Sequence, residues 1–310
     1  MTNPTEKILI TGASGQLGRE LLRQLPTEDI IPKTRESLDI TDLENVRRVF
    51  AMLQPDVVIH SAAFTNWRHP YSDKQKCWDT NVSATDNIVK TCALEGIPLI
   101  FISSGNVYSN GTEPHTENEP LSPSCYFDHT KALGEQALLN IGQMTCPEIW
   151  DSKFRYWIVR TSSLYTRPTD FGRNLPQLLL RLSQQHRASE QVLASDIARS
   201  PTYLPDFVKS LIWLARNRLE VVSGIYHMAN TGATSQFGFA NSLSLAAGLG
   251  LNFTGTPVKQ VENLYKLPEG TIARNASLCV DKWNDYAPPE ARMRPWEEAL
   301  CEFASDYKLA

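Results

Sequence analysis

The segment CYFDHTK, residues 125–131, contains a thiol, a phenol, an imidazole and an ammonium group, all of which can transfer protons. The residue four positions before Lys131 is Phe127, whereas the phenol of Tyr126 stands five positions before it. On a helix, residues four apart differ by about 40° in direction and residues five apart by about 140°, so Tyr126 should point elsewhere. Phenylalanine has no proton to give, so the source of a proton is the central question about this chain.

A glycine-rich turn near the N-terminus is the second chemical signal. The run ILITGASGQLGRE places its glycines between an expected strand and an expected helix. Glycine permits a tight turn and lets backbone N–H groups approach a pyrophosphate, while the helix N-terminus faces the negative charge. The turn therefore predicts a dinucleotide site. Its expected contact residues are Gly12, Ser14, Gly15, Gln16, Leu17 and Gly18.

The choice between NAD(H) and NADP(H) depends on the end of the second expected strand. NAD sites usually have an Asp or Glu there, which binds the ribose 2′-hydroxyl. This chain has Thr34 and Arg35, and no acid before Glu36. These residues could bind a 2′-phosphate or form a solvated basic turn. Because a carboxylate is absent and a cation is present, the pattern favours NADP(H) over NAD(H).

Alternating strands and helices must position these residues. Continuous apolar runs predict strands at 7–11, 29–32, 56–61, 99–104 and 156–160. Apolar residues at helical spacing predict helices at 15–25, 42–53, 80–95 and 130–140. This alternation predicts an α/β fold with a doubly wound parallel sheet, a Rossmann domain, over residues 1–160.

The rest of the chain, residues 161–310, has a looser pattern and reads as a smaller substrate-binding lobe, partly interwoven with the first domain. Helices are expected near 175–184, 204–216, 236–247 and 296–303, with a late strand at 224–229.

Composition excludes several function classes. A net charge of -4 over 310 residues leaves no electrostatic footprint for nucleic acid or for an anionic membrane. The N-terminal MTNPTEK has no apolar core and no apolar run is long enough to span a bilayer, so we expect a cytoplasmic protein. The six cysteines show no CxxC or zinc-like spacing, so we expect reduced thiols and no metal site.

Five further motifs point to a family. They are LDITD (38–42), QPDVVIHSAAFTN (54–66), FISSGNVYSNG (101–111), KALGE (131–135) and IARSPTYLPD (197–206). In this order and spacing they resemble the extended short-chain dehydrogenase/reductases of the dTDP-4-dehydrorhamnose reductase family, whose relatives include the regulatory β subunit of methionine adenosyltransferase. The resemblance covers nearly the whole chain. It implies an NAD(P)-dependent oxidoreductase of biosynthesis with a small-molecule substrate, and leaves a homodimer open.

The resemblance also assigns roles to residues. Ser104 falls at the family's catalytic Ser/Thr, which donates a hydrogen bond to the substrate carbonyl. Lys131 matches the lysine that holds the nicotinamide ribose and lowers the pKa of the family's tyrosine. Phe127 occupies the place of that tyrosine, and Tyr126 is the displaced candidate. Further expected cofactor contacts are Asp39, Ile40, Ser61, Ala62, Ala63, Thr65, Asn81 and Ser103, although Asn81 fits a structural role equally well.

Two departures from the family pattern leave the substrate open. Gly105 stands where the family usually has an aspartate, and the loop Asp196–Thr202 lacks the family's glutamine and glycine. The loop gains Arg199, which could bind an anionic group or face solvent. Aromatic residues expected either to shape a pocket or to be core are Phe64, Trp67, Tyr108, Tyr165 and Phe171.

The sequence thus predicts an NADP(H)-dependent reductase that acts on a carbonyl or imine of a small metabolite or sugar nucleotide, with an atypical proton donor. Tyr126 on a distorted helix start, His129, Cys125 or a water held by Ser104 could supply the proton. The alternatives are a catalytically silent, nucleotide-binding regulatory subunit and a non-redox cyclase or lyase that reuses the pocket.

Overall fold

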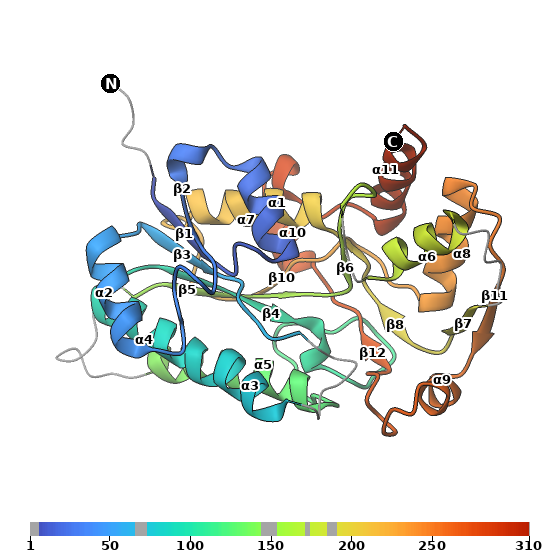
Figure 1. Ribbon diagram of the computed structural model, residues 1–310, viewed down its shortest axis with the longest axis horizontal. Coiled ribbons are helices and arrows are strands. Elements are labelled where there is room, and N and C mark those ends of the chain that lie inside the picture. The colour runs from blue at the N-terminus through green and yellow to red at the C-terminus, as the bar shows by residue number, and fades with distance from the viewer. Residues whose placement is uncertain (1–5, 66–72, 144–153, 171–173, 185–190, 310) are drawn as a thin grey trace. The chain divides into compact units, whose positions relative to one another are not determined.

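The computed structural model describes residues 6–65, 73–143, 154–170, 174–184 and 191–309 (Figure 1). The chain forms two compact units, each built from separate segments. The first comprises 1–104, 126–159 and 211–226, and the second comprises 105–125, 160–210 and 227–310. The prediction was a division at residue 160 with the two parts partly interwoven. Segment 105–125 belongs to the second unit and segment 211–226 to the first, because strands and helices far apart in sequence pack together.

A six-stranded sheet with the order β10-β5-β4-β3-β1-β2 forms the centre of the first unit. Its strands are β1 (Ile8–Thr11), β2 (Ile30–Lys33), β3 (Val57–His60), β4 (Leu99–Ser104), β5 (Tyr156–Thr161) and β10 (Gly224–His227). The first four pair in parallel, with Ile8 opposite both Ile30 and Val57. Every residue of β1 and β3 is buried, as their continuous apolar runs predict. The predicted doubly wound fold is confirmed.

Helices cover both faces of this sheet. Figure 1 shows α2 (Leu43–Leu53), α4 (Ala84–Glu95) and α5 (Tyr126–Gln143) on one face and α1 (Gln16–Gln24) on the other. The helices on the first face bury a continuous core against the strands, which includes Phe50, Ile88, Phe101 and Leu138. Helix α2 begins where the Asp42 side chain accepts a hydrogen bond from the Asn45 N–H, and α4 ends at Gly96, whose φ is 66°.

The helix predicted at 80–95 has a more complex start. A short helix, α3 (Lys74–Trp78), and a π-helical turn (Asp79–Ser83) precede α4. π-Helical turns are rare and often lie at functional sites, where they redirect a side chain. Here the turn contains Asn81, which is buried.

The second unit combines helices with two-stranded sheets. Three helices begin and end as predicted, namely α6 (Leu175–Gln184), α7 (Leu204–Arg216, shared with the first unit) and α8 (Gln236–Ala247). The remaining helices are α9 (Val258–Leu264), α10 (Asp281–Tyr286) and α11 (Trp296–Leu309). The small sheets pair β7 (Gln191–Ala194) with β11 (Phe253–Thr256), β8 (Ala198–Arg199) with β12 (Asn275–Ala276), and β6 (Leu164–Tyr165) with β9 (Thr202–Tyr203).

Aromatic residues form much of the second unit's core. Tyr165 stacks on Tyr203 at 5.3 Å and meets Phe239 and Phe303 edge to face. Tyr165 is therefore a core residue. Trp67 and Phe171 lie outside the described residues.

The structure bears on the expectations about membrane spans, metal ligands and cysteines. Within the described ranges, no helix is long and apolar enough to cross a bilayer. The same ranges hold no group of His, Cys, Asp or Glu side chains that could bind a metal ion. Five cysteines are free thiols, and Cys146 lies outside the described residues.

Candidate active site

The glycine-rich turn between β1 and α1 leaves no room for a side chain at Gly12, nor does the first turn of α1 at Gly18. Gly12 has a φ of +72°, and a Cβ atom there would lie 2.8 Å from the Cα of Ala62. A Cβ at Gly18 would lie 2.5 Å from the Cα of Ala13. The Gly15 N–H donates to the Gly12 carbonyl at 2.9 Å, and Gly15 precedes α1 without a side-chain cap. The turn thus brings bare backbone and the uncapped N–H groups of α1 to one place, as an anion site requires.

A buried histidine ties the ends of β1 and β3 together behind this turn. His60 lies between the hydroxyls of Thr11, at 2.7 Å, and Thr85, at 3.1 Å. Burial, with the positive charge of Lys131 as the second cause, lowers the pKa of His60 to about 3, so the ring is neutral. Ser61 donates to the Thr11 carbonyl at 2.6 Å. The Ser61 side chain is therefore used to join the two strands.

Sequence reasoning missed His60. The available signal was a single polar residue ending an otherwise apolar strand, just before the small residues Ser61, Ala62 and Ala63. The five residues that follow β3 are Ser61, Ala62, Ala63, Phe64 and Thr65. The first four are half-buried, and Thr65 is exposed.

Past the end of β2, the turn is polar and Arg35 is exposed. The Thr34 N–H donates to the Ser37 hydroxyl at 2.9 Å. The Asp39 carboxylate accepts from the Thr41 hydroxyl at 2.6 Å and from the Thr41 N–H at 2.9 Å, and these bonds lower its pKa. The turn is thus shaped by its own side chains.

Buried Ile40 is held from α4. The Asn87 side-chain amide donates to the Ile40 carbonyl at 3.1 Å, which fixes the position of this part of the chain.

The Asn81 side chain hydrogen-bonds the π-helical turn to the segment after β3 and to α5. Its amide oxygen accepts from the Phe64 N–H at 2.8 Å, and its amide nitrogen donates to the Phe64 carbonyl at 3.2 Å. The same nitrogen donates to the Thr130 hydroxyl of α5 at 3.0 Å. Through these bonds Asn81 positions the segment after β3.

The two serines at the end of β4 face different surroundings. Ser103 is buried, and its hydroxyl donates to the Glu135 carboxylate of α5 at 2.5 Å. Ser104 is half-buried at the last position of the strand. The Ser103 hydroxyl is thus used inside the first unit.

Lys131 is buried in the first unit, with 4% of its surface exposed. Its ammonium donates to the Ile102 carbonyl at 2.7 Å and lies 4.2 Å from the centre of the Phe101 ring. Burial lowers the pKa of Lys131 to about 8, while the Glu135 carboxylate opposes that shift. A lysine of this kind changes charge close to physiological pH.

The tyrosine question has a geometric answer. Helix α5 is continuous from Tyr126, so Phe127 lies one regular turn before Lys131. The Tyr126 hydroxyl donates to the Lys74 carbonyl at the start of α3, at 3.4 Å, and the Lys74 ammonium lies 5.4 Å from its ring. The phenol therefore faces α3, not the Lys131 ammonium.

His129 and Cys125 are the other side chains considered as proton donors. His129 is exposed, and Cys125 is buried at the start of α5.

The loop that departs from the family pattern lies in the second unit. Arg199 is half-buried and donates to the carbonyls of Ala198 at 2.7 Å and Ala273 at 2.5 Å. Its guanidinium thus joins β8 to the segment before β12, which neither expectation for Arg199 had anticipated. Asp196 accepts from the Val258 N–H at 2.6 Å and so fixes the start of α9.

A buried polar cluster adjoins segment 105–125 in the same unit. Tyr108 accepts a hydrogen bond from Arg160 and donates to the Thr116 carbonyl at 2.9 Å. His227, whose pKa burial lowers to about 3, lies 3.3 Å from the same phenol. Because Tyr108 is fully buried and its three partners belong to the chain itself, it is a structural residue.

Comparison with known proteins covers both units. Residues 6–309 match the family described as RmlD substrate binding domain. The chain is 30% identical over 310 residues to the spore coat polysaccharide biosynthesis protein SpsK of Bacillus subtilis, covering 98% of this chain and 99% of that protein. It is 30% identical over 305 residues to the dTDP-4-dehydrorhamnose reductase of Streptomyces griseus, covering 96% of this chain and 93% of that protein.

Solved structures agree. The dTDP-4-dehydrorhamnose reductase of Bacillus anthracis, crystallised in complex with NADP, superposes with a TM-score of 0.81 at 27% identity, over 96% of this chain and 98% of that one. The UDP-glucose 4-epimerase of Thermus thermophilus, at 18% identity and a TM-score of 0.75, shares the fold over 98% of this chain and 99% of that one.

Proposed function

The chain belongs to the RmlD substrate binding domain family, as its motifs predicted, and on this premise we propose that it is an NADP(H)-dependent reductase of a sugar-nucleotide carbonyl. The proton donor of this reductase is not the family's phenol, because Phe127 stands in its place. The observation that carries the proposal is that one unit holds both the glycine turn after β1 and a buried lysine on α5 whose ammonium lies at β4.

The first unit fits a dinucleotide. A methyl group at Gly12 or Gly18 would clash with backbone, so these glycines permit the tight turn and the close packing of α1, while Gly15 is the position where a pyrophosphate needs close approach. The uncapped start of α1 offers N–H groups to the phosphate oxygens. When bound, the nicotinamide supplies a hydride, and the chain's own groups orient the substrate and manage the proton.

Cofactor preference follows from the end of β2. NADP differs from NAD by a 2′-phosphate, which needs a cation and no opposing carboxylate. Exposed Arg35 offers that cation, and Thr34 stands where NAD sites place their acid. The NADP bound to the Bacillus anthracis relative supports the same preference.

Ser104 and Lys131 are the chain's remaining groups for carbonyl chemistry. We assign Ser104 the hydrogen bond to the substrate oxygen, because it ends β4 at the position of the family's catalytic Ser/Thr. In its protonated form, Lys131 places a positive charge beside the end of β4, which favours a negative charge developing on that oxygen. The proton itself comes from a water held at Ser104, because the phenol of Tyr126 is turned toward Lys74.

One observation favours a second candidate function. Phe127 carries no proton, and the Lys131 ammonium donates to the Ile102 carbonyl instead of to a phenol. A regulatory subunit that binds a nucleotide without turnover needs neither a phenol at position 127 nor a Lys131 ammonium that contacts one. It predicts tight NADPH binding, no turnover and co-purification with a partner enzyme.

The test is NADPH oxidation by the purified chain with dTDP-4-dehydrorhamnose, followed by the loss of NADPH absorbance and by product mass. The proposal predicts a product that has gained two hydrogen atoms, and a Lys131→Met variant that loses the rate. Exposed Lys209→Met is the matched control and should behave like the wild type. NADPH binding without consumption across nucleotide-sugar ketones would favour the regulatory alternative.

A further inference from the structure

Two side-chain hydrogen bonds join helix α5 to the end of strand β4 inside the first unit. Ser103 donates to the Glu135 carboxylate at 2.5 Å, and the Lys131 ammonium donates to the Ile102 carbonyl at 2.7 Å. On the helix, Lys131 and Glu135 lie about one turn apart, and on the strand, Ile102 and Ser103 are neighbours. The two bonds are therefore adjacent links between the same two elements, directly before Ser104.

The groups that form these links are shielded from water. Glu135 is fully buried, while Ser103 and Lys131 each keep only 4% of their surface exposed. The Phe101 ring lies 4.2 Å from the ammonium and packs so closely on α5 that a Cβ atom at Gly134 would lie 2.9 Å from it. Charges that water does not screen interact strongly over short distances. The Glu135 carboxylate therefore acts on Lys131 with little screening.

Three other titratable groups surround the lysine. Burial lowers the pKa of Lys131 to about 8, and the Glu135 carboxylate opposes this shift, with a smaller effect in the same direction from Cys77 of α3. On β3, His60 is neutral, because burial and the charge of Lys131 lower its pKa to about 3. Asp128 is a second buried acid on α5, three residues before Lys131.

The remaining charges on the elements that pack against α5 lie near the surface or are paired. Strand β4 contributes no titratable side chain. On α4, Asp86 and Lys90 pair with each other at 2.6 Å, and Glu95 is exposed. The Asp79 carboxylate of the π-helical turn accepts from a glutamine side chain at 2.8 Å, and both lysines of α3 are exposed. Glu135 is thus the acid through which the fold acts most directly on Lys131.

We propose that Glu135 is a positioning residue of the reductase: its carboxylate, which Ser103 holds in place, keeps the Lys131 ammonium charged beside β4. The inference rests on the proposed function, in which the charge of Lys131 stabilises the substrate oxygen, and it adds the group that maintains this charge. A buried ammonium without an opposite charge nearby loses its proton at a lower pH. The hydrogen bond from Ser103 to the carboxylate is charge-assisted, so it limits the movement of the Glu135 side chain.

The test is the pH dependence of folding stability, which needs neither cofactor nor substrate. Urea denaturation of the full chain between about pH 6 and pH 11 is compared with the same series for Lys131→Met, so that the difference isolates the lysine. In the wild type this difference rises with pH from about pH 8, where the folded chain loses the Lys131 proton while the unfolded chain keeps it. We call the pH at which the folded chain loses this proton the Lys131 midpoint.

Glu135→Gln keeps the size of the side chain and removes its charge. Measured against the variant that carries Glu135→Gln and Lys131→Met together, its Lys131 midpoint should lie at least about one pH unit below that of the wild type. Glu135→Asp keeps a carboxylate and should restore most of the wild-type midpoint.

The rate of ketone reduction by NADPH gives a second readout. Because the charged form of Lys131 stabilises the substrate oxygen, the rate should fall as the pH rises through the Lys131 midpoint. Glu135→Gln should move this fall to lower pH by the same amount as in the stability series. A merely structural role for Glu135 would lower the rate at every pH and leave the position of the fall unchanged.

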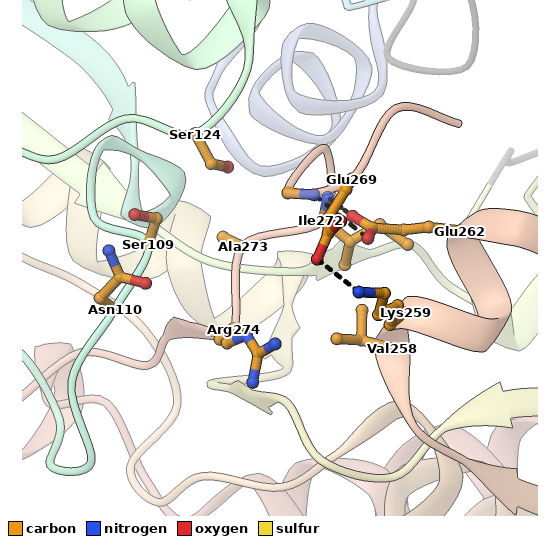
Figure 2. Close-up of a pocket in the computed structure, with 11 residues that line it drawn as sticks. Ser109, Asn110, Ser124, Val258, Lys259, Glu262, Glu269, Ile272, Ala273 and Arg274 are labelled. Atoms are coloured by element: carbon orange, nitrogen blue, oxygen red, sulfur yellow. Dashed lines mark hydrogen bonds and ion pairs between the residues drawn. The ribbon is translucent and has the colours of Figure 1, made fainter.

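An exposed pair of the same chemistry supplies the matched control. In the second unit, Lys259 and Glu269 line a polar pocket of about 400 Å³ together with Arg274 (Figure 2). The charged groups of the pair lie 3.0 Å apart, but 61% of the Lys259 side chain and 70% of the Glu269 side chain are exposed, so water screens their attraction. Glu269→Gln should therefore leave the Lys131 midpoint unchanged.

The second buried acid of α5 tests whether the effect belongs to Glu135. Asp128→Asn should move the Lys131 midpoint less than Glu135→Gln does, and an equal or larger shift would overturn the inference. An unchanged midpoint in Glu135→Gln would overturn it as well. If Glu135→Gln does not fold, the variant that also carries Lys131→Met should fold, since both buried charges are then removed together. A double variant that stays unfolded would show that Glu135 supports the fold independently of Lys131, which contradicts the proposal.

These outcomes separate the role of Glu135 from the reductase. If the Lys131 midpoint shifts as predicted and no ketone is reduced, the proposed function fails and the action of Glu135 on Lys131 stands. If a ketone is reduced while the midpoint in Glu135→Gln is unchanged, the role of Glu135 fails and the reductase stands.

Discussion

Restoring a phenol at position 127 addresses the chemistry directly. Phe127 is half-buried on α5, one turn before Lys131, so Phe127→Tyr adds a hydroxyl on the helix face that carries this lysine. A positioned general acid is typically worth about 10²–10⁴-fold in rate, which corresponds to roughly 3–5 kcal/mol of the barrier. The Lys131 ammonium, which now donates to the Ile102 carbonyl, would also stabilise the ionised form of the new phenol. We therefore expect Phe127→Tyr to raise the rate of ketone reduction at least about tenfold.

The assay is single-turnover NADPH oxidation with a sugar-nucleotide ketone, since it isolates the chemical step from product release. Tyr126→Phe is the matched control. Its hydroxyl makes one long bond, 3.4 Å to the Lys74 carbonyl, so its removal should change the rate less than about twofold. If Phe127→Tyr folds and binds NADPH but reduces no faster, position 127 does not face the reacting oxygen. If Tyr126→Phe abolishes activity, the displaced tyrosine is the donor and the reasoning is wrong.

Three further predictions concern stability and cofactor choice. The pKa of Lys131 falls from 10.5 in the unfolded chain to about 8 in the folded one. Between pH 8 and pH 10.5 the unfolded chain therefore binds one more proton than the folded chain. The free energy of unfolding should rise by about 2–4 kcal/mol as the pH rises through this range. Urea denaturation at a series of pH values checks this rise, which Lys131→Met should remove. Gly18→Ala places a methyl group 2.5 Å from the Cα of Ala13, so we expect it to cost about 2–3 kcal/mol in urea denaturation and to weaken NADPH binding measured by fluorescence titration. A stable, tightly binding alanine variant would contradict the close packing of this turn. Arg35→Asp should lower the ratio of NADPH affinity to NADH affinity by about tenfold or more, because the new carboxylate repels a 2′-phosphate and accepts a hydrogen bond from a 2′-hydroxyl. An unchanged ratio would exclude Arg35 from the cofactor site.

Local patterns of apolar residues predicted most of the strands and helices. The strands of the main sheet were visible because each is a short apolar run buried on both faces, as in β1 and β3. Helices α6, α7 and α8 were predicted to the residue because their apolar spacing and flanking residues agree. The two-residue strands β8 and β12 were not, since nothing in so short a run favours extended backbone until its partner lies beside it.

The site divides in the same way. The glycine turn was readable because steric exclusion is a property of residue type, as the 2.8 Å approach of Ala62 to a Cβ at Gly12 illustrates. By contrast, sequence spacing did not reveal that Ser103 is held by Glu135, that Asn81 binds Phe64 and Thr130, or that His60 joins two strands. Each of these bonds joins residues at least seventeen apart in the chain.

The sequence by itself determined that a glycine-rich turn, a strand-end serine and a lysine at family spacing are present, and that the residue one turn before this lysine has no hydroxyl. Only the tertiary structure decided where the remaining polar groups point: the phenol of Tyr126 at Lys74, the ammonium of Lys131 at Ile102, and Arg274 into a pocket with Lys259. The reason is physical. Residue type and helical period are local properties, whereas burial, and with it the pKa and partner of each charged group, depends on segments brought together only when the chain packs.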